Sequence, residues 1–390
     1  MSPLCESFVD AEHLDQAEAF YPLRAWVCEG CLLVQVPEYV EPGRIFTEYA
    51  YFSSYSTSWV EHARRYVDMA VERFGLDDRS QVVELGSNDG YLLRHVVARG
   101  IPALGIEPAA NVARAAEQAR VPTLVRMFDE ALARTLVASG RSADLLIANN
   151  VLAQVSDLNG FVRAMARLLA PGGVATLEFP HLVRLVADNQ FDTIYHEHFS
   201  YFSLTTAERI FATHGLTTFD VEELPTHGGS LRLFLCHAGD GPRPVRDRVD
   251  ALRAREAAAG VTGLAYYAGF AESVRATKRK LLEFLIGAKD EGRRIAGYGA
   301  PGKGNTLLNY CGIGPDFLDY TVDRNPHKHG KFLPGTRIPI LAPDRLRETK
   351  PDYVLILPWN LTAEIVEQVA YVREWGGRFV VPIPEVKVLT

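Results

Sequence analysis

The chain has 390 residues, too many for one ordinary hydrophobic core, so its length predicts two or three domains. Hydrophobic residues make up 47% of it and charged residues 23%, as is typical of folded globular proteins, and no apolar run approaches the roughly 20 residues of a membrane-spanning helix. The net charge of -7 argues against broad nucleic-acid binding, which usually needs a basic face. Five scattered cysteines, and an N-terminus without the basic flank and apolar core of a signal peptide, predict a cytoplasmic protein with no disulfide framework.

The composition changes along the chain and divides it into regions. Residues 1–75 are irregular and contain a cysteine pair, whereas 76–240 alternate short apolar strands with amphipathic helices, the pattern of a parallel α/β sheet. A polar stretch at about 245–290 has apolar positions at helical spacing, which predicts a helical connector, and a second α/β unit follows it. We therefore expect an α/β protein with two Rossmann-like domains, 76–240 and 241–390, and a small irregular N-terminal region.

The first Gly-rich turn belongs to QVVELGSNDG, residues 81–90, where an apolar strand runs into a helix. Glycines let the backbone turn tightly and approach a ligand, and the helix N-terminus favours polar or anionic groups. A carboxylate ends the second strand, where it can accept hydrogen bonds from ribose hydroxyls, and two asparagines end the third strand at the same edge. The residues expected to bind a cofactor at this edge are Glu84, Gly86, Asn88, Gly90, Glu107, Asn149 and Asn150.

The turn at 168–173, LLAPGG, distinguishes between two kinds of nucleotide-binding domain. It resembles class I methyltransferases, which use S-adenosylmethionine, more than dehydrogenases, whose loop is typically G-x-G-x-x-G. Because the E-x-G-x-x-x-G motif is a weak signal by itself, a pyridine-nucleotide domain and a ligand-free sheet are the alternatives.

Aromatic and titratable residues gather just after the fourth strand, in IYHEHFSYF at 194–202. Methyl transfer to carbon needs an electron-rich carbon, which forms when a base removes a proton alpha to a ketone. A base that is neutral near pH 7 suits histidine, and the resulting enolate oxygen needs a donor nearby. The alternatives are a polar turn with a structural histidine, and a metal site on His196 and His198, although a third ligand at a recognisable spacing is missing.

A second Gly-rich loop, GYGAPGKGN at 297–305, fits G-x-G-x-x-G, with Asp323 ending the next strand. It also approaches a P-loop, but Gly304 stands where the Mg²⁺-binding hydroxyl belongs, so we expect no ATP hydrolysis. Glycines, a helix N-terminus and Lys303 predict a phosphate cradle. The basic residues at 324–331 add positive charge nearby, or form a plain solvated loop. A separate polar cluster, HGGSLR at 227–232, could bend the backbone against a ligand, or be a plain glycine turn before a strand.

Together these motifs resemble the nucleotide-sugar C-methyltransferases of antibiotic deoxysugar pathways, which add branched methyl groups to dTDP-linked 4-keto sugars. The similarity runs over nearly the whole chain. Its most specific pieces are YFSS at 51–54, ELGSNDG at 84–90, GIEP at 105–108, NNVL at 149–152, YHEH at 195–198, HGG at 227–229, YGA at 298–300, KGN at 303–305 and DRNPHK at 323–328.

The resemblance implies that the middle domain binds S-adenosylmethionine and that the C-terminal domain holds a dTDP-sugar. Methylation would take place alpha to the ketone, at carbon 3 more than carbon 5, through an enolate. His198 would be the base, with Glu197 and Tyr195 as its neighbours. The residues expected to bind the sugar nucleotide are His227, Gly228, Tyr298, Gly299, Lys303, Asn305, Asp323, Arg324, His327 and Asn360.

The sequence departs from the family pattern at two places. The family normally begins with a small zinc domain carrying two C-x-x-C pairs, but only Cys28 and Cys31 form such a pair here, so a zinc site would be incomplete. Gln154 stands where the family usually has histidine, and glutamine cannot titrate. The alternative functions are a nicotinamide-dependent sugar-nucleotide oxidoreductase that uses the second loop, and a non-catalytic sugar-nucleotide-binding protein.

Overall fold

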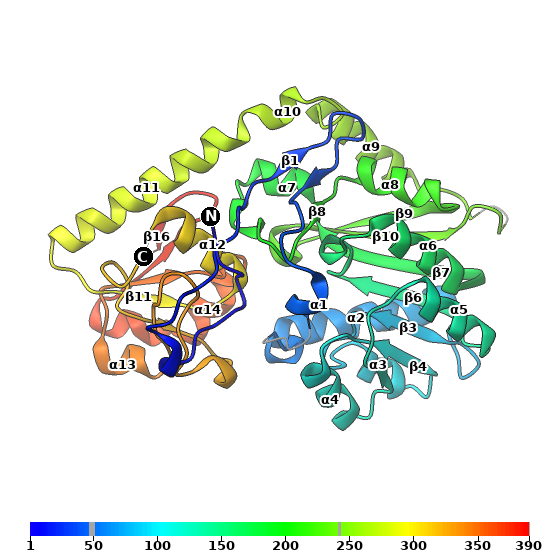
Figure 1. The fold of residues 1–390 in the computed structure, drawn as a ribbon, viewed down its shortest axis with the longest axis horizontal. Coiled ribbons are helices and arrows are strands. Elements are labelled where there is room, and N and C mark those ends of the chain that lie inside the picture. The colour runs from blue at the N-terminus through cyan, green and yellow to red at the C-terminus, as the bar shows by residue number, and fades with distance from the viewer. Residues whose placement is uncertain (47–50, 241–242, 390) are drawn as a thin grey trace.

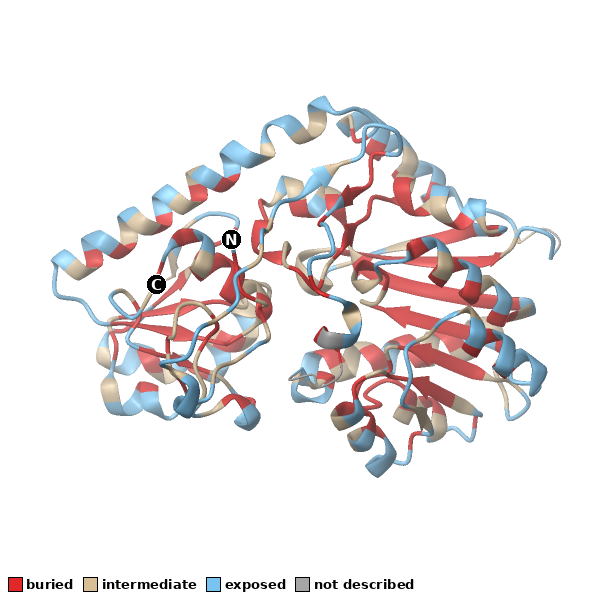
Figure 2. Ribbon diagram, in the orientation of Figure 1, coloured by how far each residue is buried: buried red, intermediate tan, exposed pale blue. Residues whose placement is uncertain are grey.

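The computed structural model describes residues 1–46, 51–240 and 243–389. Two α/β domains lie side by side, and a helical arch joins them over the top (Figure 1). Burial is concentrated in the sheets and in the inward faces of the helices (Figure 2). No helix in the described part of the chain is long and apolar enough to cross a lipid bilayer.

The first domain is built on a seven-stranded sheet with the order β5-β4-β3-β6-β7-β10-β9. Its first five strands are parallel, and β10 runs antiparallel to both β7 and β9. The strands are β3 (Val82–Leu85), β4 (Ala103–Ile106), β5 (Thr123–Leu124), β6 (Ala143–Asn149), β7 (Leu169–Pro180), β9 (Leu216–Leu224) and β10 (Ser230–His237). The crossover helices are α3 (Leu93–Val97), α4 (Ala110–Gln118), α5 (Glu130–Ala138) and α6 (Leu158–Leu168), and α8 (Leu204–Thr213) leads into β9. Because parallel strands are covered on both faces, β3 is apolar at nearly every position.

Helix α2 (Thr57–Phe74) belongs to this first domain, although it lies inside the predicted region 1–75. The side chain of Ser56 caps its N-terminus by accepting from the Trp59 amide, and Gly75 ends it in the left-handed conformation. Its apolar face packs in the same core as Val82 and Leu145 of the sheet. The irregular region therefore ends before this helix.

The second domain has a six-stranded sheet with the order β13-β12-β11-β14-β15-β16, parallel except for β16. The strands are β11 (Ile295–Tyr298), β12 (Thr321–Val322), β13 (Ile340–Leu341), β14 (Tyr353–Ile356), β15 (Arg378–Val381) and β16 (Lys387–Leu389). The helices are α12 (Gly302–Cys311), α13 (Arg345–Thr349) and α14 (Thr362–Gln368). The prediction of two α/β domains is confirmed.

The predicted connector is helical and consists of α9 (Asp247–Ala259), the short α10 (Ala265–Ala268) and α11 (Phe270–Asp290). Val249 and Leu252 of α9 belong to the core of the first domain. Leu281 and Leu285 of α11 belong to the core of the second. The arch seen in Figure 1 is therefore anchored in both domains.

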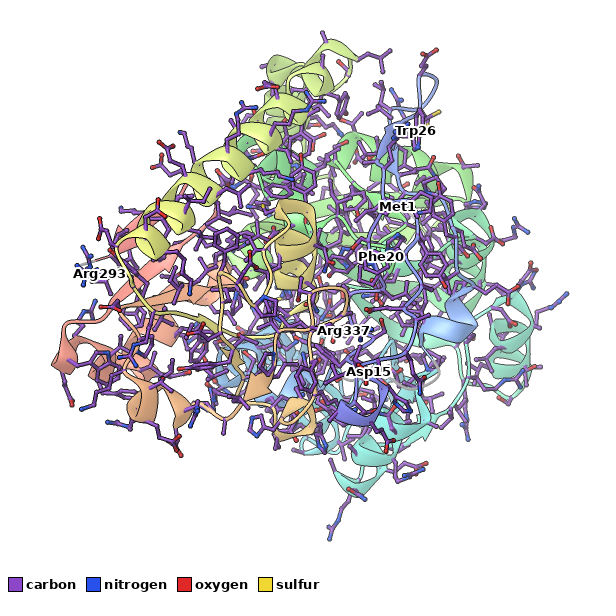
Figure 3. All side chains as sticks on the ribbon, turned by 60° about the vertical axis from the view of Figure 1, so that its left-hand side comes forward. Met1, Asp15, Phe20, Trp26, Arg293 and Arg337 are labelled. Carbon is purple, nitrogen blue, oxygen red and sulfur yellow. The ribbon has the colours of Figure 1, made fainter. Side chains whose placement is uncertain are left out.

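The N-terminal segment, residues 1–46, contacts both domains. Its strand β2 (Val34–Gln35) pairs with β1 (Trp26–Val27) and with β8 (Ser200–Tyr201) of the first domain. Closer to its start, Val9 pairs with Phe332, and the amide of Gly335 donates to Glu18 Oε1 at 3.0 Å, both in the second domain. In Figure 3 the segment passes from Trp26 and Phe20 to Asp15, beside Arg337.

Candidate active site

A cleft of about 1080 Å³ lies between the two domains and is lined by both of them and by the N-terminal segment. Most of the predicted site residues line this one cleft, although they come from separate stretches of sequence. They are Gly86, Asn88, Glu107, Asn149, Asn150, Tyr195, His198, His227, Tyr298, Gly299, Lys303, Asp323, Arg324 and Asn360. The residues predicted to bind the cofactor and those predicted to bind the substrate therefore line the same cleft.

Glu107 organises the cofactor edge of the first domain. Its Oε2 accepts a hydrogen bond from the Asn88 amide and its Oε1 accepts one from the Ala109 amide, each at 2.9 Å. The backbone at Gly86 has φ +63, and a side chain there would begin 2.6 Å from Val151, so the close turn requires glycine. The turn and the carboxylate thus form one rigid wall of the cleft.

Two buried acceptor oxygens that line the cleft at this edge make no hydrogen bond within the described chain. They are the side-chain carbonyl oxygens of Asn149 and Asn150. S-adenosylmethionine carries an ammonium group, a sulfonium and ribose hydroxyls, which are cations and donors, so the residues present fit this cofactor.

Asp323 repeats the arrangement of Glu107 in the second domain. Its Oδ2 accepts from the Ala300 amide at 2.7 Å and its Oδ1 accepts from the Asn325 amide at 2.8 Å. Gly299 has φ +90, and a side chain there would begin 2.5 Å from Pro358. Each domain therefore ties its Gly-rich loop to the next strand through one carboxylate.

The N-terminus of α12, predicted to cradle a phosphate, holds a carboxylate of the chain itself. Oε1 of Glu6 lies 3.3 Å from the position that a side chain on Gly302 would take, and Oε2 lies 3.6 Å from Lys328 Nζ. Burial raises the pKa of Glu6, while the charge of Lys328 and a hydrogen bond from the Gly302 backbone oppose that rise. The carboxylate of Glu6 therefore lies at the helix N-terminus where the sequence predicted a phosphate.

His198 is fixed by the short helix η4 (Phe191–Thr193) that precedes it. Its Nδ1 donates to the backbone carbonyl of Thr193 at 3.0 Å, because a carbonyl can only accept, and this leaves the lone pair on Nε2. The ring of Tyr195 lies 4.1 Å from the His198 ring, centroid to centroid. Burial lowers the pKa of His198 to about 4, helped by the charge of Lys303, so the imidazole is neutral at pH 7.

His227 faces the cleft from a turn with φ +53, so its backbone is in the left-handed region. Its Nε2 lies 3.1 Å from Asn150 Nδ2, and its ring meets the edge of Trp59 at 4.9 Å. Burial lowers its pKa to about 4. Next to it, a side chain on Gly228 would begin 2.6 Å from Trp359, so glycine there allows the two domains to meet closely.

Glu197 does not share the cleft with His198, which corrects its assignment beside the base. It is 1% exposed, and its Oε2 accepts a hydrogen bond from the buried thiol of Cys5 at 3.0 Å. Burial raises its pKa to about 7. Its carboxylate therefore joins the YHEH motif to the N-terminal segment rather than to a substrate.

Four other predicted residues lie away from the cleft. Glu84 is buried in β3, and a side chain on Gly90 would begin 2.9 Å from Val121, so Gly90 serves packing. Asn305 donates to the Cys5 carbonyl at 2.5 Å. His327 stacks on Phe52 at 5.4 Å and lines a separate hollow on the outside of the molecule.

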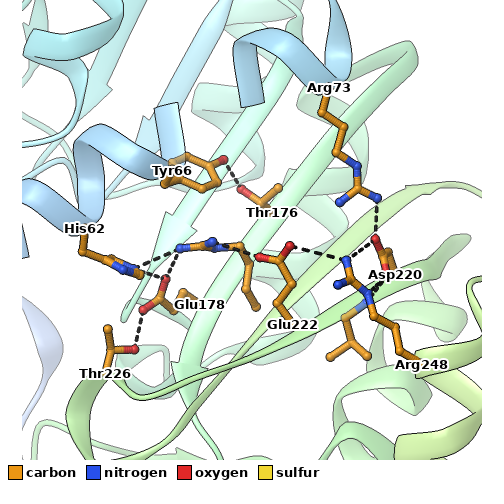
Figure 4. Close-up of polar contacts among 11 residues, drawn as sticks. His62, Tyr66, Arg73, Thr176, Glu178, Asp220, Glu222, Thr226 and Arg248 are labelled. Atoms are coloured by element: carbon orange, nitrogen blue, oxygen red, sulfur yellow. Dashed lines mark hydrogen bonds and ion pairs between the residues drawn. The ribbon is translucent and has the colours of Figure 1, made fainter. Parts of the chain in front are cut away.

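A buried ionic network that the sequence analysis missed joins α2, β7 and β10, and two of its members, His62 and Thr226, line the cleft (Figure 4). Glu178 of β7 accepts from Arg232 of β10 at 2.7 Å, from Thr226 at 2.8 Å, and meets His62 at 2.9 Å. Burial alone would raise the pKa of Glu178, but His62 and Arg232 together hold it at about 2. The sequence does carry a signal for this network: TLEFP and SLRLFLC each place one charged residue within an otherwise apolar strand.

Comparison with known proteins fits these features. A methyltransferase domain model matches residues 59–221, a C-methyltransferase C-terminal domain model matches 225–384, and a putative zinc binding domain model matches 1–46. The fold and the site therefore define a class I S-adenosylmethionine-dependent methyltransferase. The C-methyltransferase NovU of Streptomyces niveus is 37% identical over 389 residues, which is 100% of this chain and 92% of that protein. The chain belongs to this C-methyltransferase family.

Other similarities are more distant. The ubiquinone biosynthesis O-methyltransferase of Rhizobium etli is 26% identical over 115 residues, 27% of this chain and 46% of that protein. An S-adenosylmethionine-dependent methyltransferase from Clostridium acetobutylicum has a TM-score of 0.38 at 11% identity, covering 46% of this chain and 92% of that one. The magnesium protoporphyrin IX methyltransferase of Synechocystis, solved with bound S-adenosylmethionine, has a TM-score of 0.34 at 16% identity, covering 46% and 80%. Family membership rests on the full-length relative.

The residues matched by the zinc domain model do not form a complete metal site. Cys28 and Cys31 are exposed in a turn, and Cys5 is buried against Glu197. Across residues 1–46, 51–240 and 243–389, no group of three or more His, Cys, Asp or Glu side chains is arranged to hold a metal ion. A structural zinc needs four ligands, so the ligands present here do not fit one.

We therefore expect this chain, purified as given, to contain far less than one zinc per molecule. Elemental analysis after dialysis checks the prediction, and EDTA should leave the melting temperature unchanged because no structural metal is lost. One tightly bound zinc per chain would contradict it.

We also expect Glu107→Ala to weaken S-adenosylmethionine binding at least tenfold. The change removes hydrogen bonds to a charged group, each worth about 1.5–3 kcal/mol, and frees the Asn88 loop that Glu107 holds. Isothermal titration calorimetry measures the dissociation constant, with the exposed Glu117→Ala as the control. An unchanged dissociation constant in Glu107→Ala would remove this residue from the cofactor site.

Proposed function

We propose that the protein transfers a methyl group from S-adenosylmethionine to a carbon alpha to the ketone of a nucleotide-linked keto-deoxysugar. The favoured substrate is a dTDP-4-keto-deoxysugar methylated at carbon 3, in the cytoplasm. One observation carries the proposal: a neutral, oriented histidine, the cofactor edge and the Gly-rich loop of the second domain all line one cleft.

His198 performs the first step in this proposal. Thr193 holds the ring by Nδ1, so Nε2 takes the proton from the carbon next to the ketone and the substrate becomes an enolate. When bound, S-adenosylmethionine supplies an electrophilic methyl group on a sulfonium. Glu107, with Asn149 and Asn150, would hold that cofactor against the first domain.

The substrate would extend from this point along the second domain. Tyr298 and Asp323 lie at the ends of its strands, and Arg324 lines the cleft 3.7 Å from Glu364. Because Glu6 occupies the N-terminus of α12, we assign the diphosphate to the part of the cleft near Arg324 instead. A guanidinium is well suited to a phosphate there.

The test is an assay with methyl-labelled S-adenosylmethionine and a dTDP-4-keto-deoxysugar. We expect a product heavier by one methyl group, with the new methyl on carbon by NMR. The 4-hydroxy sugar obtained by reduction is the matched control and should not react, because no ketone acidifies its neighbouring proton. Methylation of an oxygen, or none with any 4-keto sugar nucleotide, would refute the proposal.

A further inference from the structure

Lys303 occupies an unusual place for a phosphate-binding lysine. Its Nζ donates to Asn360 Oδ1 at 2.8 Å and lies 4.6 Å above the ring of Trp359. It belongs to the first turn of α12, and its side chain lines the same cleft as His198 and His227 of the other domain. Glu6 occupies that terminus, and Lys328 pairs with Glu6.

Two consecutive residues of η4 connect Lys303 to His198. Asp192 Oδ2 accepts from Trp359 Nε1 at 2.8 Å, and Trp359 is the ring that lies under the lysine. The next residue, Thr193, accepts from His198 Nδ1 at 3.0 Å. One rigid turn therefore positions both the cation and the base at the same wall of the cleft.

The charges around Lys303 agree with this position. Burial lowers the pKa of both His198 and His227, and the positive charge of Lys303 lowers both further. Burial lowers the pKa of Lys303 itself to about 8, and Asp192 opposes that shift. An ammonium near the proposed base can stabilise a negative charge that develops there.

We propose that Lys303 is a catalytic residue that donates a hydrogen bond to the ketone oxygen and stabilises the enolate. The inference rests on the proposed function. An ammonium has three N–H donors, of which Asn360 engages one and fixes the direction of the others. Asn360 and Asp192 are positioning residues, the latter through Trp359.

The bonds balance without another reactant. His198 takes the proton, the C–H electron pair becomes the C=C bond, and the carbonyl pair moves to oxygen, where Lys303 binds it. The α carbon then takes the methyl group while the carbon–sulfur bond breaks with its electrons going to sulfur. The ketone re-forms, Lys303 is still protonated, and His198 releases the proton it took to solvent.

The test is solvent exchange of the proton alpha to the ketone, followed by NMR in D₂O with S-adenosylhomocysteine in place of the methyl donor. Lys303→Met should lose exchange about 10²–10³-fold at saturating substrate, the usual cost of removing an oxyanion donor. Its dissociation constant for dTDP should stay within about threefold. Lys289→Met, which removes a lysine paired with Asp319 in the same domain, is the control.

Each result has one meaning. Wild-type exchange in Lys303→Met, or a tenfold weaker dTDP affinity with normal exchange at saturation, would overturn the inference and return the lysine to the diphosphate. If the wild type neither exchanges nor methylates any 4-keto sugar nucleotide, the proposed function itself fails.

A second variant covers the case in which Lys303→Met does not fold. Because the protonated lysine is the active form and its pKa is about 8, wild-type exchange should fall as the pH rises through 8. The groups that face it, Asp192 with a pKa of about 7 and His198 and His227 with a pKa of about 4, are already deprotonated there. Lys303→Arg keeps its charge and should not show that fall, whereas an identical alkaline fall in both proteins would overturn the inference.

Discussion

His198→Ala should lose about 10²–10⁴-fold in turnover while still binding the cofactor and the sugar nucleotide. That range is the usual contribution of a positioned general base. The structure supplies the positioning: Thr193 fixes the ring through Nδ1, and Nε2 keeps the lone pair. Deuterium exchange into the substrate, with S-adenosylhomocysteine bound, should disappear with turnover, because both depend on removal of the same proton.

His196→Ala is the matched control for that experiment. His196 is 3% exposed, and its Nε2 meets the Pro22 carbonyl at 3.1 Å, so it supports the N-terminal segment and is not part of the cleft wall. Its loss should lower the melting temperature but leave exchange near the wild-type rate below that temperature. If His198→Ala exchanges normally, the role of the base passes to His227, which also lines the cleft.

The proposed role of His198 also predicts how the rate of exchange depends on pH. The neutral ring is the base, and burial lowers the pKa of His198 to about 4. On the acid side, exchange should therefore be fully present near pH 7 and be lost as the pH falls through about 4. An acid limb near the ordinary histidine value of 6.5 would contradict this lowered pKa.

Arg232→Met should destabilise the protein by about 3–5 kcal/mol, because it leaves the carboxylate of Glu178 buried without its closest cation. Glu178 is fully buried, and Arg232 is 4% exposed. Urea unfolding followed by circular dichroism measures the change in the free energy of unfolding. The control is Arg255→Met, which breaks an exposed pair with Glu223 and should change stability by less than about 1 kcal/mol.

A second substitution separates charge from packing in that network. If the cost comes from the unpaired carboxylate, adding Glu178→Gln to Arg232→Met should recover part of the lost stability, since the amide carries no charge. The pKa of Glu178 is held at about 2, so the stabilisation should be present above pH 4.5 and be lost as the pH falls toward 2. A double variant no more stable than Arg232→Met alone would point to packing.

The cofactor edge was predictable because its residues follow the ends of parallel strands. Glu107 and Asn149 each end a recognisable apolar strand, and the carboxyl ends of parallel strands meet at one edge. His198 was found by its motif, and the structure adds the Thr193 contact that orients it. Local patterns of this kind can be read from the sequence.

The contacts that could not be predicted join distant parts of the chain. Nothing in the motif YHEH indicates that Glu197 turns toward Cys5, 192 residues away. The Gly-rich loop at Gly302 predicts an anion, and an anion is present, but it is the side chain of Glu6. Such outcomes depend on the path of the N-terminal segment, which has little periodicity of its own.

That path sets the order of events during biosynthesis. The segment leaves the ribosome first, but its partners Asn305, Phe332 and Gly335 are among the last residues to be made. Its contacts with the second domain can form only after Gly335 has been made, long after the first domain is free to fold. In the complete fold Cys5 is 2% exposed, because its sulfur lies against Glu197 of the first domain and Gly302 of the second. Protection of that thiol from alkylation on stalled nascent chains would therefore mark the moment at which the enzyme is complete.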